Sequence, residues 1–252
     1  PEAWTEDPGR RAEARIPDDI RFRTKLELAL AMIRRAKEDG IPPGIVLVDC
    51  AYGNSSEFRE ELRKLGLDYA VAIQGPTMVQ KLDRLERGRG APVSARDLAA
   101  ELVEKNKFKR CTWRDGTRGQ LSARFAAVRV ASAHQNKWSD LNEREALWLL
   151  IERIDGESGP NAFKYYLSNL PDGMSRRQIV HRIKERYRIE RSYEDLKGEL
   201  GLDHYEGRRW PGWNHHVSVV ICCYAFIVAE LARRFPPSGR RAQRDRPLSV
   251  AA

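Results

Sequence analysis

The sequence predicts an α/β fold, and three observations lead to this prediction. Residues 45–48 form a short, continuous apolar run, and residues 68–73 form a second one. Between them, Ser55 or Ser56 can cap a helix that ends at Gly66. A strand, a helix and a strand within about thirty residues form a βαβ unit, whose two strands are parallel.

The chain before this unit is expected to begin as a surface connection, because residues 1–22 are polar and interrupted by prolines. An amphipathic helix is predicted from Thr24 to Gly40, where apolar side chains recur at helical spacing. Its apolar positions are Leu26, Leu28, Leu30, Ala31 and Ile33. Residues 45–48 are expected to be buried on both faces, since a parallel strand covered by helices is continuously apolar.

The pattern changes after Gln74, where the chain becomes charged and then rich in strand signals. Ser94 is predicted to cap a helix over residues 95–104. Alternation over residues 121–133 predicts a strand, and residues 148–154 are expected to pair with residues 163–167 across a turn.

The last part of the chain is predicted to be helical. Helix is expected from Ser175 to about Leu200, with a break at Gly201 and at the turn Pro211-Gly212, and again to about Phe235. The predicted domains are a partial core over 1–75, a β-rich insertion over 76–172, C-terminal helices over 173–235, and a disordered basic tail over 236–252.

Charge favours a polyanionic partner. The chain has 45 Lys and Arg against 36 Asp and Glu, a formal net charge of +9. A surplus of this sign is typical of proteins that bind nucleic acid, although many basic proteins bind none.

The apolar segments predict no membrane partner. No apolar run reaches the roughly 18–20 residues that cross a bilayer, and the longest, 217–228, is interpreted as a buried helix. The first residues lack the charged start and apolar stretch of a signal peptide. The four cysteines have no CxxC spacing and are interpreted as reduced and buried, which is typical of a cytoplasmic protein.

Asp49 follows directly on the apolar run 45–48. A carboxylate at the C-terminal edge of a parallel sheet lies where such sheets bind their ligands. The alternative is that Asp49 only caps a turn, and this position alone does not decide between the two.

A second group of charged residues lies in the predicted C-terminal helix. Arg186, Glu190 and Lys197 are spaced four and seven residues apart. At ~100° per residue they fall within roughly 40° of one another on one helical stripe. The alternative is an exposed Arg–Glu pair worth ~0.3–0.5 kcal/mol with a lysine nearby.

These elements together, in this order, resemble the DDE transposases of bacterial insertion sequences. One branch of that family carries the motif Tyr-x2-Arg-x3-Glu-x6-Lys on the helix that supplies the last catalytic carboxylate. Arg186-x3-Glu190-x6-Lys197 matches three of its four positions, and Ile183 stands at the tyrosine position. The string Val48-Asp49-Cys50-Ala51-Tyr52-Gly53 is similar to the segment around the second catalytic aspartate, and residues 199–208 and His215-His216 are similar to one subgroup of the branch.

The resemblance implies a ribonuclease-H-like fold, incomplete at its N-terminus, with a β-rich insertion before the last catalytic helix. It implies that Asp49 and Glu190 are catalytic and bind metal, as part of a site for two Mg²⁺ ions. Arg186 and Lys197 would then contact phosphate, Arg as a fork and Lys as a point charge. The implied partner is double-stranded DNA, both transposon ends and target, with a homodimer as a further expectation and the bacterial nucleoid as the location.

The first catalytic aspartate of the family has no counterpart that can be carried over. Asp7, Asp18 and Asp19 lie in polar, proline-flanked sequence with no buried strand. We therefore expect the chain to be the C-terminal portion of a transposase, inactive by itself. The alternatives are a catalytically dead DNA-binding remnant and a different nuclease of the same fold.

For two further groups the sequence leaves more than one interpretation. The predicted insertion contains Trp113, Trp138 and Trp148, and in some relatives an aromatic side chain of this region stacks on a flipped base. The sequence does not choose among the three, and core packing is the better interpretation of Trp148. The His215-His216 pair could contact phosphate or metal, but packing or hydrogen bonding at a helix start is more common.

Overall fold

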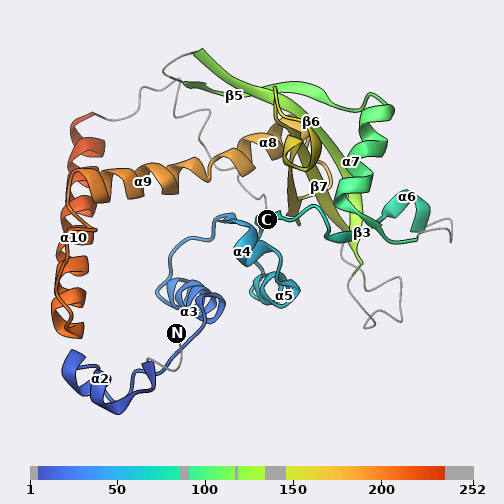
Figure 1. Cartoon of the computed structure of the whole chain (residues 1–252). Coiled ribbons are helices and arrows are strands. Elements are labelled where there is room, and N and C mark those ends of the chain that lie inside the picture. The colour runs from blue at the N-terminus through green and yellow to red at the C-terminus, as the bar shows by residue number, and fades with distance from the viewer. Residues whose placement is uncertain (1–4, 86–90, 117–118, 134–145, 236–252) are drawn as a thin grey trace. The chain divides into compact units, whose positions relative to one another are not determined.

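A computed structural model describes residues 5–85, 91–116, 119–133 and 146–235 (Figure 1). The chain divides into two compact units, one formed by Arg23–Tyr187 and the other by Pro1–Phe22 with Arg188–Ala252. Each unit is described by itself.

The unit Arg23–Tyr187 is built on one eight-stranded sheet in the order β1-β2-β8-β7-β6-β3-β4, with β5 paired to β6. Only β1 and β2 are parallel; the other described pairs are antiparallel. The strands are β1 Val46–Val48, β2 Tyr69–Ile73, β3 Met78–Lys81, β4 Val93–Ser94, β5 Lys109–Gly116, β6 Gly119–Ser132, β7 Ala146–Arg153 and β8 Phe163–Ser168.

The helices of this unit begin at side chains that satisfy their first backbone N–H groups. Thr24 and Glu27 form a capping box at the start of α3, and Ser175 and Gln178 form another at the start of α8. Ser55 and Ser94 cap α5 and α7. The helices are α3 Lys25–Glu38, α4 Cys50–Gly53, α5 Ser56–Lys64, α6 Leu82–Leu85, α7 Ala95–Glu104 and α8 Arg176–Lys184, with a 3₁₀ turn, η2, over Gly159–Ala162.

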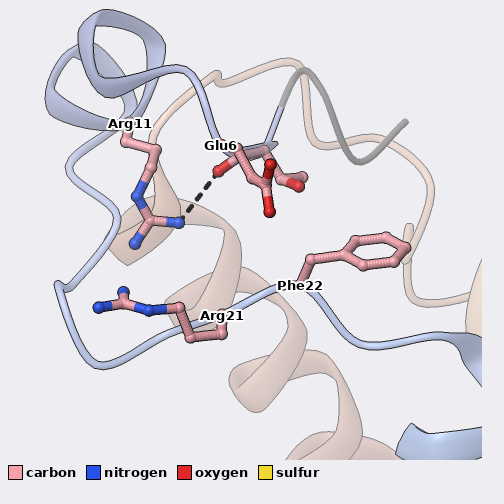
Figure 2. A pocket seen from close by; sticks show the side chains of 5 residues that line it. Glu6, Arg11, Arg21 and Phe22 are labelled. Carbon is pink, nitrogen blue, oxygen red and sulfur yellow. Dashed lines mark hydrogen bonds between the residues drawn. The ribbon is translucent and has the colours of Figure 1, made fainter.

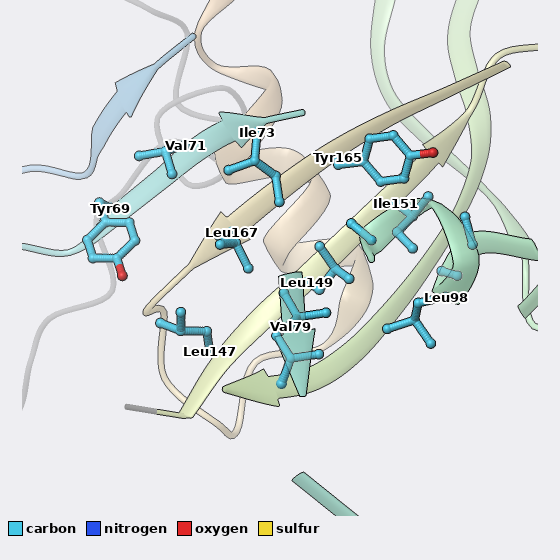
Figure 3. Close-up of a cluster of buried hydrophobic side chains, with 14 of the residues drawn as sticks. Tyr69, Val71, Ile73, Val79, Leu98, Leu147, Leu149, Ile151, Tyr165 and Leu167 are labelled. Atoms are coloured by element: carbon cyan, nitrogen blue, oxygen red, sulfur yellow. The ribbon is translucent and has the colours of Figure 1, made fainter. Parts of the chain in front are cut away.

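Apolar side chains cover both faces of the sheet. On one face, alternate residues of β2, β8 and β7 pack with α5 and α7, and the apolar side of α3 packs against the same cluster. Figure 3 shows Val71, Ile73, Leu149, Ile151 and Leu167 on this face. Full burial of one such side chain stabilises the fold by about 1.5–3 kcal/mol.

The other face is covered by α8. Ile179, Val180 and Ile183 are buried against Phe125 of β6 and Leu150 of β7. The C-terminal end of α8 is therefore held firmly on the sheet.

The unit formed by the two ends of the chain contains α2 Pro8–Ala14, most of α9 Tyr187–Gly198, and α10 Trp210–Arg234. Many large apolar side chains of α10 are exposed, among them Ile221, Phe226 and Leu231. An 18-residue window of α10 has a mean hydropathy of 1.7 and is only 6% buried, so by length and composition this helix passes the test for a membrane span. The prediction of a buried helix over 217–228 was wrong.

The α/β prediction is confirmed, and so are the parallel βαβ unit, the helix after Thr24, the helix over 95–104, and the pairing of β7 with β8. The strands β3, β4 and β5 and the short helix α4 were not predicted. The strands of the predicted insertion continue the same sheet as β1 and β2, because β8 pairs with β2.

Two burial predictions were wrong. β1 is half-buried rather than buried on both faces, because in the described sheet it is an edge strand. Only Cys111 is buried, whereas Cys50, Cys222 and Cys223 are exposed.

Candidate functional site

Asp49 lies at the C-terminal end of β1, where it is exposed and caps the one-turn helix α4. Its Oδ1 atom accepts a hydrogen bond of 3.0 Å from the backbone N–H of Ala51. The interpretation of Asp49 as a cap is thus confirmed. Asp49 also lies at the C-terminal end of the parallel strand pair β1 and β2, so the cap does not exclude a role in ligand binding. The role of Asp49 as a catalytic metal ligand stays a prediction.

The segment after Asp49 is held tightly against β2. Gly53 lies so close to the backbone of Ala72 that a Cβ at position 53 would clash with its carbonyl oxygen, and would stand 2.9 Å from the Cβ of Val71. The side chain of Asn54 accepts a hydrogen bond of 2.9 Å from the backbone N–H of Gln74. These contacts tie α4 to the end of β2.

Beside Asp49 opens a pocket of about 580 Å³. It is lined by Asp49, Cys50, Ala72, Ile73, Gln74, Gly75, Pro76, Arg96, Asn161, Phe163, Lys164, Tyr165, Tyr166 and Arg186. Two residues predicted for the site, Asp49 and Arg186, therefore line the same pocket although they are far apart in the sequence.

The charges of the lining favour an anion. Arg96, Lys164 and Arg186 contribute three cationic side chains, and Asp49 is the one carboxylate of the lining. Phosphate is an anion that Arg and Lys bind well, the former through paired N–H groups.

Beneath the pocket wall lies a buried ion pair. The hydroxyl of Tyr166 donates a hydrogen bond of 3.0 Å to Glu152, whose carboxylate also contacts Lys184 Nζ at 2.6 and 2.7 Å. Burial lowers the pKa of Lys184, and the charge of Glu152 opposes that shift. The Lys184 ammonium also lies 4.5 Å from the centre of the Trp113 ring, so Trp113 is occupied in packing.

Tyr165 differs from its neighbour Tyr166. Its side chain is 5% exposed, and its hydroxyl has no hydrogen-bond partner among the described residues. Burial raises the pKa of Tyr165, while the charge of Arg96 opposes the shift. The phenol is therefore neutral at neutral pH.

Arg186 lies in the turn between α8 and α9, not within a continuous helix. The prediction of one helical stripe for Arg186, Glu190 and Lys197 was wrong in this respect, because the chain leaves the helical path after Lys184. Glu190 lies in the first turn of α9 and Lys197 in its last turn, and both are exposed. They belong to the other unit, and their convergence with Asp49 stays a prediction.

The described residues of the pocket do not supply a complete set of metal ligands. In the described ranges, no group of three or more His, Cys, Asp or Glu side chains is placed to hold a metal ion. Asp49 is an oxygen donor of the kind that Mg²⁺ prefers, so it fits the role of one ligand but does not make a site alone.

The remaining candidates have structural roles or lie outside the described residues. The indole N–H of Trp148 donates to the carbonyl of Pro171 at 3.2 Å, and Arg129 lies over its ring. His216 is 3.1 Å from the carbonyl of Gly201 and packs on Tyr205. Trp138 lies outside the described residues.

A smaller hollow of about 280 Å³ lies in the N-terminal segment, lined by Thr5, Glu6, Arg11, Arg21 and Phe22 (Figure 2). The Arg11 guanidinium donates to the carbonyls of Thr5, Pro17 and Ile20 at 3.1, 2.9 and 2.8 Å. Its cation holds the segment together, which is a structural role.

Residues 1–120 match the family model described as DDE superfamily endonuclease. The match supports a DDE-type, transposase-like domain and a nuclease function at the level of the family. It covers Asp49 and the βαβ unit and does not extend to Arg186 or Glu190. The mixed α/β sheet is compatible with such a domain. No curated protein matches the chain.

Arg96, Lys164, Tyr165 and Tyr166 were not identified from the sequence. Lys164, Tyr165 and Tyr166 reach the pocket because β8 pairs with β2, with Tyr165 opposite Ile73 and Tyr166 opposite Ala72. Arg96 reaches it at the start of α7, where its backbone N–H donates to the carbonyl of Gly75. The sequence predicted β8 but not this pairing, and nothing else in the sequence points to these four side chains.

Proposed function

We propose that this chain is the catalytic portion of a cut-and-paste DNA transposase of an insertion sequence. The observation that carries the proposal is the position of Asp49. It stands at the C-terminal end of the first strand of the βαβ unit, inside the segment that matches the DDE family, and it lines a pocket with three cationic side chains.

In this proposal Asp49 and Glu190 bind divalent metal, and Arg186 and Lys197 bind DNA phosphate. The metal ions would activate the attacking water or DNA 3′-hydroxyl and stabilise the leaving oxygen. Arg186 draws a phosphate toward Asp49, since its guanidinium can donate two parallel N–H bonds. The ribonuclease-H-like topology and the action at transposon ends are parts of the same proposal.

The test is cleavage of DNA that carries the sequences flanking the gene, by the full chain in Mg²⁺ buffer. The proposal predicts nicking that EDTA abolishes and that is lost in Asp49→Asn and in Glu190→Gln. It differs here from the expectation that the chain is inactive by itself, and the same assay decides between the two. Asn keeps the capping oxygen of Asp49, so this variant removes the charge without removing the cap. Nicking that persists in both variants would contradict the assignment of Asp49 and Glu190 as catalytic residues.

A DNA-binding remnant without catalysis is the second candidate. It is favoured by the lining of the pocket, which holds one carboxylate against three cations. Binding of the flanking DNA by the wild-type chain, with no cleavage in Mg²⁺ or Mn²⁺, would support it over the enzyme.

A further inference from the structure

One corner of the pocket brings together Gly75, Arg96 and Tyr165. A Cβ built on Gly75 would stand 3.2 Å from the ring of Tyr165 and 3.4 Å from Nε of Arg96. The backbone N–H of Arg96 donates to the carbonyl of Gly75 at 3.0 Å, which anchors the start of α7 at this corner. Lys164, the neighbour of Tyr165 on β8, lines the same pocket.

The hydroxyl of Tyr165 makes this corner unusual. Its side chain is nine-tenths buried, and the hydroxyl finds no acceptor among the residues that the structure describes. A buried polar group without a partner destabilises the fold, so a ligand that accepts from it is favoured. The nearby carboxylate of Asp97 accepts from the hydroxyl of Ser94 at 2.7 Å instead.

We propose that this corner binds one backbone phosphate of double-stranded DNA, held by Arg96 and the hydroxyl of Tyr165. Lys164, which precedes Tyr165 on β8, points to the opposite face of the sheet, where it lies opposite Glu152. A phosphodiester has only acceptor oxygens; the Arg96 guanidinium supplies only donors, and the neutral phenol of Tyr165 can donate its proton. The hydroxyl is covered, whereas Arg96 is exposed, so the atoms that cover the hydroxyl have to shift for a phosphate to reach it. The inference rests on the proposed function and adds a phosphate contact beside Asp49 that the sequence did not predict.

The proposal is tested by DNA affinity and its salt dependence, with the full chain and a fluorescent DNA duplex of the flanking sequence. Arg96→Gln should weaken binding and reduce the slope of log K against log [salt] by about 0.9, the value for one phosphate contact. Lys107→Gln is the matched control, because it removes one charge from an exposed lysine outside the pocket lining and should leave affinity nearly unchanged.

Tyr165→Phe separates a ligand contact from a structural one. It should weaken DNA binding roughly tenfold, as expected for a lost hydrogen bond to a charged group. The melting temperature without DNA should stay the same or rise, because the variant loses a hydroxyl that has no partner within the described part of the chain. Tyr205→Phe is the matched control, which should lower the melting temperature because its hydroxyl no longer donates to the carbonyl of Arg209, with little effect on affinity, since Tyr205 is not in the pocket lining.

Each outcome decides a different point. If the wild-type chain binds DNA and cleaves it, but the Arg96 and Tyr165 variants bind like Lys107→Gln, this inference fails and the proposed function stands. If the wild-type chain binds no DNA, both fail. Tighter binding of an RNA duplex of the same sequence would overturn DNA as the ligand of this corner.

Discussion

The ammonium of Lys184 lies 2.6 and 2.7 Å from the two oxygens of Glu152, and the two side chains are 17% and 7% exposed. This ion pair joins the end of α8 to β7, two residues before Arg186 enters the pocket. Lys184→Met should lower the free energy of unfolding by about 3–5 kcal/mol, because it leaves Glu152 buried and without its cation. Urea unfolding measures the change.

The double variant Lys184→Met, Glu152→Met is the control for this prediction. Because both charges are then removed, it should be more stable than Lys184→Met alone. A double variant that is less stable than the single one would contradict the assignment of a buried charge penalty.

A second ion-pair group predicts a dependence of stability on pH. Hydrogen bonds from Lys105 and then Lys81 lower the pKa of Glu101 from 4.5 to about 2. The folded state holds the charged form more strongly than the unfolded state, so this stabilisation is complete above pH 4.5 and is lost as the pH falls toward 2. Glu101→Gln should therefore lower the melting temperature at pH 7, and the difference from wild type should shrink at pH 3.

The exposed Glu104 provides the comparison on the same helix. Glu104→Gln should follow the wild-type curve at both pH values. An equal loss for Glu101→Gln at pH 7 and at pH 3 would rule out the electrostatic cause.

The two roles of Asp49 can be separated by substitution. Asp49→Ala removes the oxygen that accepts from Ala51 and should destabilise the chain by about 0.5–2 kcal/mol, whereas Asp49→Asn should stay near wild type. Both should abolish metal-dependent cleavage. Unfolding curves measured beside the nicking assay decide this, and a stable Asp49→Ala variant would contradict the cap.

The contact of Gly53 with β2 predicts a strong effect of one methyl group. Gly53→Ala should lower the free energy of unfolding by about 1–3 kcal/mol through overpacking against Ala72 and Val71. It should also weaken DNA binding, because α4 carries Asp49 and Cys50 at the pocket. Gly44→Ala is the control, since a Cβ at position 44 meets no atom within 4 Å.

The sequence predicted the elements with strong local signals better than it predicted their arrangement. The cap at Thr24, the cap at Ser94 and the apolar run of β2 each lie in a few adjacent residues, and each prediction is confirmed. The edge position of β1 and its partial exposure depend on which strands pair with it, which no local pattern records.

The same contrast between local signals and three-dimensional arrangement holds for the candidate site. Asp49 was found because a carboxylate directly after an apolar run is a local feature, and Arg186 because of a motif. Lys164 and Tyr165 enter the pocket only through the pairing of β8 with β2. The hydroxyl of Tyr165 lacks a hydrogen-bond partner among the described residues because of how the chain packs around it. Packing of this kind cannot be predicted from a local sequence pattern.

The close contact between Gly53 and the backbone of β2 also limits how this protein can be engineered. Every replacement at this position adds a Cβ where the carbonyl of Ala72 already stands, so the position offers no room for a new specificity. A library that aims to retarget the pocket has to keep glycine there and diversify exposed neighbours such as Cys50 and Gln74.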